Sequence, residues 1–242
     1  MDSEHSHPHL QPIPDPSAPG SLTDTPDQTI SEDVALALLK SGEVSTEQIE
    51  QIIKIPSAMK SRKVRLALAA HSRVPRRLAL RIIRGLYTFD LAQFTRLPAA
   101  AADLKHVADE LLISRLTSVT LGERISLARR ASASVAAALL LDKDSRVWQS
   151  ALENPRLTEA AIVKALHKNG ATTAFVEALC RHGRWSLRHE IRIALLRNPH
   201  TPLARAIEFA RRLPPPLLRD VLHASRLPEK IKQYLRKELH KR

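Results

Sequence analysis

Cysteine is almost absent from this sequence, since Cys180 is its only one. A single thiol excludes an intramolecular disulfide, and it excludes a zinc or iron–sulfur centre held by several cysteines. Cys180 follows the apolar stretch 174–179, which favours a buried structural thiol over a reactive one. This cysteine usage is typical of the reducing cytoplasm, and we expect no cofactor.

Glycine and aromatic residues are also scarce, with 6 glycines in 242 residues and an aromatic fraction of 3%. The glycines lie too far apart for a phosphate-binding loop, and the sequence has neither a paired-histidine zinc helix nor a nucleophile elbow. Asp142 and Asp144 lie close together, but they precede a helical pattern, where we interpret them as caps rather than as a catalytic acid and base. We therefore predict a protein without enzymatic activity and without a metal site.

Long apolar runs are missing as well. The longest, Ala133 to Leu141 broken by Ser134, is far short of the ~20 residues that a membrane span needs. The first residues also lack the basic start and apolar run of a signal peptide. We expect a soluble, cytoplasmic protein with no transmembrane segment.

Basic residues are absent from the first part of the chain. Residues 1–34 carry seven acidic side chains and no Lys or Arg, whereas the rest carries 38 basic and 18 acidic side chains, a net charge of +20. Residues 1–30 also hold six of the 16 prolines and few large apolar residues, so we predict a disordered, Pro-rich acidic tail. Its histidines are interpreted as part of a solvated segment rather than as a transition-metal site: His5, His7 and His9.

The rest of the chain, residues 31–242, contains helix-forming residues at helical spacing. Ala, Leu, Ile and Val recur every three or four residues, and Pro, Gly, Ser or Thr interrupt the pattern about every 8–15 residues. Ser31 and Gly42 bound a first helix, and Ser45 with Gln48 forms a capping box for a second helix that Pro56 ends. The sequence therefore predicts an all-α fold.

One helical pattern occurs three times without gaps. It reads VRLALAAH at residues 64–71, VWQSALEN at 147–154 and IRIALLRN at 191–198. A fainter copy starts at Ile125, and the interval from Ile125 to Val147 is half of that from Val147 to Ile191, which indicates a basic unit of the shorter length. One pair of such helices cannot bury both of its apolar stripes alone, so the pattern predicts stacked helical repeats.

Two of these copies resemble a known repeat family. The segments 144–158 (DSRVWQSALENPRLT) and 190–202 (EIRIALLRNPHTP) are similar to the leucine-rich repeat variant, a HEAT-like helical repeat of bacterial proteins. The resemblance covers about residues 60–85 and 120–228, whereas 86–119 match poorly and are either degenerate repeats or an insertion. It implies a right-handed α-solenoid that serves as a binding scaffold. The helix 228–242 has one apolar face and many Lys and Arg elsewhere, and we interpret it as the C-terminal cap of the array rather than as a helix that lies on an anionic membrane or nucleic acid. The iron–sulfur cluster of founding members is not expected here, because its cysteines are missing.

The candidate binding residues are basic and aromatic side chains near equivalent repeat positions. Arg65 and Arg192 occupy one repeat position, which Trp148 fills in the middle copy, and both tryptophans have arginines nearby. A basic stripe with stacking aromatics is typical of phosphate or base binding, whereas solvated arginines and buried tryptophans are the structural alternative, which we favour. The candidates are Arg65, Arg146, Trp148, Arg184, Trp185, Arg188 and Arg192, and the wider basic set adds Arg62, Lys63, Arg129, Arg130 and Arg197.

Two functions follow from these observations. The first is a non-enzymatic scaffold that binds a protein partner, with the acidic tail free to shield the basic body. The second is a nucleic-acid-binding protein with a basic solenoid face, akin to the HEAT-like DNA glycosylases, although the few aromatic residues argue against base excision.

Overall fold

The computed structural model describes residues 31–41, 44–168 and 170–240, and every regular element in this part of the chain is a helix. The prediction of an all-α fold is confirmed. The predicted tail 1–30, with His5, His7 and His9, and the expected cap Gly42 lie outside the described residues. The helices are α1 (Glu32–Ser41), α2 (Thr46–Lys54), α3 (Pro56–Lys60), α4 (Arg62–Ala70), α5 (Arg76–Arg84), α6 (Thr88–Phe94), α7 (Ala102–Arg115), α8 (Leu121–Arg130), α9 (Ala133–Leu139), α10 (Ser145–Leu152), α11 (Glu159–His167), α12 (Thr173–Arg181), α13 (His189–Arg197), α14 (Leu203–Arg211), α15 (Pro215–His223) and α16 (Glu229–His240).

Local sequence signals set the starts of several helices. The predicted capping box at Ser45 and Gln48 is present at the start of α2, and Thr120 with Glu123 forms a second one at α8. Asp144 caps α10 by accepting a hydrogen bond from the Arg146 amide, as predicted. Each cap satisfies backbone N–H groups that the first turn of a helix leaves without a partner.

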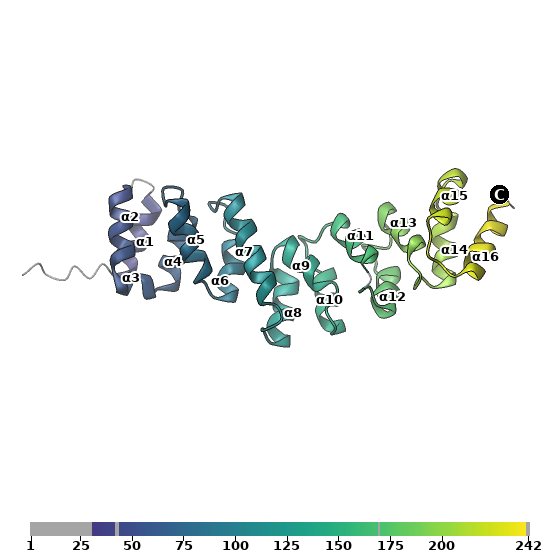
Figure 1. Cartoon of the computed structure of the whole chain (residues 1–242), viewed down its shortest axis with the longest axis horizontal. Coiled ribbons are helices and arrows are strands. Elements are labelled where there is room, and N and C mark those ends of the chain that lie inside the picture. Colours follow the sequence, from purple (N-terminus) through teal and green to yellow (C-terminus); the bar gives the residue numbers. More distant parts are fainter. Residues whose placement is uncertain (1–30, 42–43, 169, 241–242) are drawn as a thin grey trace, which may run out of the picture.

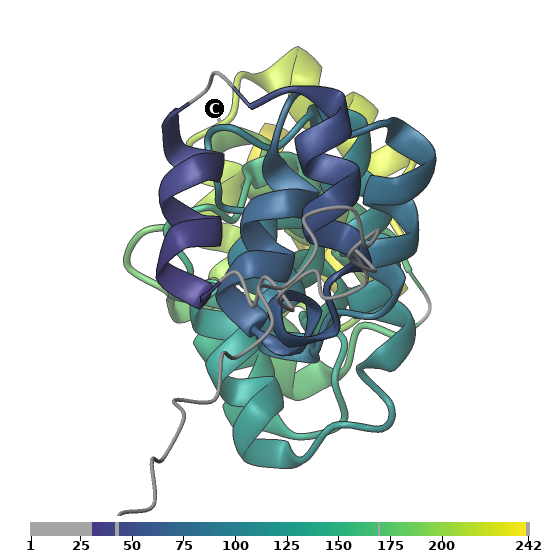
Figure 2. The same cartoon turned by 90° about the vertical axis from the view of Figure 1, so that its left-hand side faces the viewer.

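The helices follow one another along the long axis of the molecule in chain order (Figure 1). From α4 onward the principal contacts define two rows. The even-numbered row includes the neighbours α4–α6, α8–α10, α10–α12 and α14–α16, and the odd-numbered row runs through α5, α7, α9, α11, α13 and α15. Viewed from the α1 end, the array extends away behind its first helices (Figure 2). The poorly matching segment 86–119 contains α6 and α7, one helix for each row.

A single aliphatic core lies between the rows and extends from Ala35 to Leu235. Its members are mainly Ala, Leu, Ile and Val, and the buried aromatic rings include Phe94, Phe175 and Phe209. Because each helix packs mainly against helices no more than three places away in chain order, the core is built from successive local contacts. Among the described helices, none has the length and apolar character to cross a membrane.

Polar side chains join the C-terminal ends of neighbouring helices. Asn154, after α10, donates through Nδ2 to the carbonyl oxygens of Ala128 (2.8 Å) and Ala131 (3.2 Å) at the end of α8. Asn198, after α13, donates to the Leu166 carbonyl of α11 at 3.1 Å. These carbonyls have no partner within their own helices, so the asparagines satisfy buried acceptors and fix the positions of adjacent helices.

We predict that Asn154→Ala lowers the free energy of unfolding by about 2 kcal/mol, because it leaves two carbonyls without their side-chain donor in a buried site. Urea unfolding followed by circular dichroism measures the change. Gln149→Ala is the matched control, since Gln149 is exposed on the adjoining helix α10. Equal stability of the two variants would contradict a structural role for Asn154.

Candidate functional site

Both tryptophans among the sequence candidates are buried. Trp148 is 4% exposed and packs edge-on against Phe175, with ring centroids 5.6 Å apart. Trp185 is 2% exposed, and its Nε1 donates a 2.8 Å hydrogen bond to the Leu152 carbonyl at the end of α10. Neither ring offers an open face for a base, and both connect α10 to the segment around α12.

The candidate arginines are distributed over two parts of the array. Arg184 lies over the Trp185 ring at 4.1 Å, Arg188 is exposed at the start of α13, and Arg192 donates through Nε to the Ser186 carbonyl at 2.8 Å. Burial lowers the pKa of Arg192, with a further contribution from Arg212. Arg184, Trp185 and Arg188 therefore lie in the turn between α12 and α13, and Arg192 lies in the first turns of α13.

Arg65 and Arg146 lie apart from that turn and have partners of their own. Arg65, on α4 near the other end of the molecule, donates to the Gly85 carbonyl at 3.3 Å and lies 5.4 Å from the Tyr87 ring centroid. Arg146 makes a two-point contact with Asp144 at 3.0 and 2.8 Å. Its hydrogen bonds lower the pKa of Asp144 to about 2, as expected for an ionised cap.

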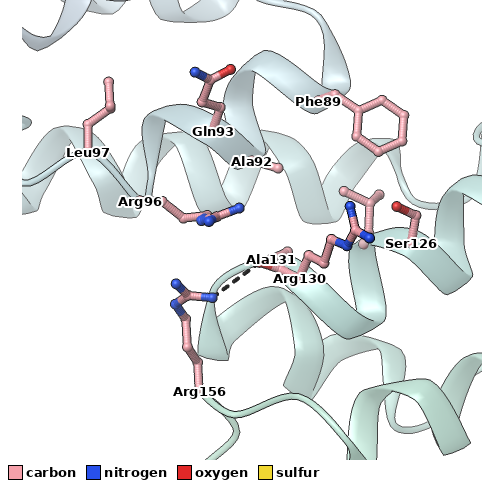
Figure 3. A pocket seen from close by; sticks show the side chains of 10 residues that line it. Phe89, Ala92, Gln93, Arg96, Leu97, Ser126, Arg130, Ala131 and Arg156 are labelled. Atoms are coloured by element: carbon pink, nitrogen blue, oxygen red, sulfur yellow. Dashed lines mark hydrogen bonds between the residues drawn. The ribbon is translucent and has the colours of Figure 1, made fainter.

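A different set of arginines lines an open cavity between α6 and α8. Arg96 follows α6, Arg130 ends α8, and Arg156 comes from the turn after α10, and all three border a cavity of about 510 Å³. Arg96 and Arg156 lie toward one end, and Arg130 extends toward Phe89 and Ser126 at the other (Figure 3). The remaining lining residues are Ala92, Gln93, Leu97, Leu127 and Ala131. We call this cavity the α6–α8 groove.

The α6–α8 groove is cationic and lacks an internal counter-charge. No acidic residue lines it. Within the described residues, neither Arg96 nor Arg130 has an ion pair, and the Arg156 guanidinium makes only a 3.4 Å contact with the Arg130 carbonyl. Phe89 adds an aromatic side chain that is 41% exposed. The arrangement is suited to binding an anion that also carries an apolar or planar group.

Only part of this groove could be predicted from the sequence. Arg130 belongs to the wider basic set named above, whereas Arg96, Arg156 and Phe89 were not among the candidate binding residues. Arg96 and Phe89 belong to the segment 86–119, which matches the repeat poorly, and the only correspondence found there, between the RLP segments 96–98 and 226–228, did not indicate a binding role. The sequence signal of Arg96 is a charged residue after a helix end, and that of Phe89 is an aromatic residue near a helix start, and many other positions share such signals.

The described residues hold no group of three or more His, Cys, Asp or Glu side chains placed to bind a metal ion. Two polar groups in the core have shifted pKa values. Burial raises the pKa of the Cys180 thiol to about 11, and burial also raises the pKa of Asp109, which accepts a 2.6 Å hydrogen bond from the Ser132 hydroxyl. Ser132 itself caps α9, so Asp109 has a structural partner.

Comparisons with protein-family models, with curated proteins and with solved structures gave no match to this chain. Its candidate site is therefore defined by geometry and charge alone.

We predict that Cys180 does not react with Ellman's reagent in the folded protein at about pH 8, because a thiol with a pKa of about 11 forms little thiolate and the side chain is buried. Absorbance at the product wavelength should show one thiol per chain only after urea is added. Stoichiometric reaction before unfolding would contradict the buried position.

We also predict that Asp109→Asn raises the free energy of unfolding at about pH 7, because the neutral amide avoids the cost of burying a carboxylate. Because the pKa of Asp109 is raised in the folded protein, its protonated carboxyl stabilises the fold at pH values below the ordinary Asp pKa. This stabilisation is lost as the pH rises through the pKa of Asp109 in the folded protein. The advantage of the variant should therefore disappear near pH 3. Urea titrations at about pH 7 and pH 3 measure the difference in free energy of unfolding between the variant and the unchanged protein. A difference that does not change with pH would contradict a raised pKa for Asp109.

Proposed function

We propose that this protein is a non-enzymatic binding scaffold whose α6–α8 groove captures an acidic segment of a protein partner. The observation that supports this function is the set of three arginines, from successive parts of the even-numbered row, that border one cavity without a carboxylate among its lining residues. Guanidinium groups bind carboxylates through paired hydrogen bonds, and such bonds are stronger than neutral ones. An acidic segment would supply the counter-charge that the groove lacks.

The scaffold itself is proposed to be a right-handed α-solenoid of HEAT-like repeats, similar to the leucine-rich repeat variant. The alternation of two helix rows supports the repeat arrangement, and its handedness follows from the resemblance. The equivalent roles of Asn154 and Asn198 also support it, because each closes a helix, accepts a hydrogen bond from the amide two residues later and donates to an earlier helix.

The distribution of basic residues favours a short protein segment over a long duplex. The α6–α8 groove belongs to the even-numbered row, whereas another arginine cluster, Arg77, Arg81 and Arg84, lies on α5 in the odd-numbered row. A duplex presents phosphates at regular spacing along a continuous track, and these clusters do not share one row. A peptide needs only one local set of contacts.

Single-stranded nucleic acid is the second candidate, and Phe89 is the observation that favours it. An exposed aromatic ring beside arginines can stack on a base while the guanidinium groups contact phosphates. In this function the ring, rather than Trp148 or Trp185, provides the stacking surface.

The test compares two labelled ligands by fluorescence anisotropy, an Asp/Glu-rich peptide and an oligothymidylate, each of about 12 units. We expect Arg96→Gln/Arg130→Gln to weaken peptide binding at physiological salt by at least about tenfold, since charge-assisted hydrogen bonds contribute roughly 1.5–3 kcal/mol each. Arg77→Gln/Arg84→Gln removes the same charge from exposed positions outside the groove and should change affinity by less than about twofold.

Equal losses in the two double variants would overturn a specific groove and leave only attraction to the net charge. Tighter binding of the oligothymidylate, reduced by Phe89→Ala, would favour the second candidate. The full chain and a chain lacking residues 1–30 are both measured, because the acidic tail is a competing anion in the first and absent from the second.

A further inference from the structure

A second cavity lies near the N-terminal end of the array, away from the α6–α8 groove. It has a volume of about 470 Å³ and is bordered by α2, α3, α4 and α5. This volume is within the range of small-molecule sites. No residue that lines the α6–α8 groove also lines this cavity.

The wall of the cavity is apolar. Ile53 comes from α2, Met59 from α3, and Leu78 and Ile82 from α5. Ile82 is buried, and the other three side chains are half-buried and pack against the core. An alkyl or aryl group placed against these side chains would lose contact with water, which is the main favourable contribution to binding at such a site.

The border of the same cavity is cationic. Lys54, Arg65 and Arg81 line it, and no acidic residue does. In the part of the chain that the structure describes, none of these three has an ion pair. Arg65 makes one hydrogen bond, of 3.3 Å through Nη1 to the Gly85 carbonyl, and its Nε is buried without an acceptor. The Arg65 charge is therefore partly removed from water and has no counter-ion.

We propose that this cavity binds a small amphipathic carboxylate, of the medium-chain fatty acid type. The alkyl chain lies along Ile53, Met59, Leu78 and Ile82, and the carboxylate is held by Lys54, Arg65 and Arg81. A polar anion such as free phosphate would leave the apolar wall unused, and a neutral hydrocarbon would leave the three charges unpaired. This site is independent of the α6–α8 groove and of the function proposed for it.

The test is isothermal titration calorimetry of the full chain with sodium decanoate, kept below its micelle-forming concentration, at physiological salt. A ligand of this size should bind with a Kd of roughly 10–100 µM. Acetate, which has the charge without the chain, and decanol, which has the chain without the charge, should each bind at least about tenfold more weakly. Decanoate binding no tighter than that of decanol or acetate would overturn the proposal, as would the absence of saturable binding.

The site is located with Lys54→Gln/Arg81→Gln, which should weaken decanoate binding by about tenfold or more. Arg77→Gln/Arg84→Gln is the matched control, because it removes two charges from the same helix α5 without altering the cavity lining. Far-ultraviolet circular dichroism verifies that both variants are folded. Equal affinities of the two variants would overturn the assignment to this cavity, and so would competition by the acidic peptide that occupies the α6–α8 groove.

Discussion

This structure depends on finding hydrogen-bond donors for the carbonyl groups at the C-terminal ends of its helices. An α-helix leaves its last four carbonyl groups without intrahelical donors, and most helices here have only 7–10 residues. A large share of the backbone acceptors therefore lies at helix ends, many of them inside the molecule. Such acceptors cost free energy when they are buried without a donor. Backbone N–H groups after the helix satisfy some of them locally, and at several helices the remaining donors come from a neighbouring helix or turn.

Different side chains meet this requirement along the array. Asn154 and Asn198 supply amide donors, Ser225 donates its hydroxyl hydrogen to the Leu196 carbonyl at 2.6 Å, and the Trp185 indole donates to Leu152. In the first half, Arg115 donates to the carbonyl of Arg84, the last residue of α5, and to that of Leu86, which follows the helix. Each bond joins elements that are not consecutive in the chain, so these bonds set the register between helices while the aliphatic core supplies most of the burial.

The same turns also place functional groups. The side-chain nitrogen of Asn154 holds α10 against the end of α8, and its side-chain oxygen accepts a hydrogen bond from the Arg156 amide at 2.8 Å. Arg156 is thereby directed toward the Arg130 carbonyl, at the border of the α6–α8 groove. The side chain that completes the packing of one helix end thus also fixes the backbone of a charged residue two positions later, at the border of the proposed binding groove.

The sequence was sufficient for local structure and insufficient for the groove. The Ser45–Gln48 capping box, the Asp144 cap and the Asn-Pro helix ends are decided within a few residues, and periodicity with helix-breaking residues predicted an all-α chain, although the short helix α3 and the break at Ser61 were not predicted. The side-chain amides of Asn154 and Asn198 donate hydrogen bonds to helices that are not consecutive in the chain. The local sequence pattern could therefore locate these turns but could not predict the hydrogen bonds that they make. The groove required knowing that α6 and α8 belong to the same row, and Arg96 and Phe89 lie where the repeat pattern is weakest.

Net charge cannot account for selectivity in such a protein, and this limits what the basic body contributes. Exposed charges farther apart than a Debye length of about 8 Å are largely screened at physiological salt, so the surplus of +20 mainly raises the rate of encounter with any anion.

Several of the basic side chains already have partners within the protein. Arg146 pairs with Asp144, Arg184 lies over the Trp185 ring, and Arg192 donates to the Ser186 carbonyl. Selectivity must therefore come from the few cations that line cavities without a carboxylate. The α6–α8 groove and the second cavity differ in their remaining walls, since Gln93 and Ser126 accompany the arginines of the first, whereas Ile53 and Met59 accompany the cations of the second. If both proposed ligands bind, the equal number of cations with unlike walls is the physical basis on which the protein would distinguish an acidic peptide from an amphipathic acid.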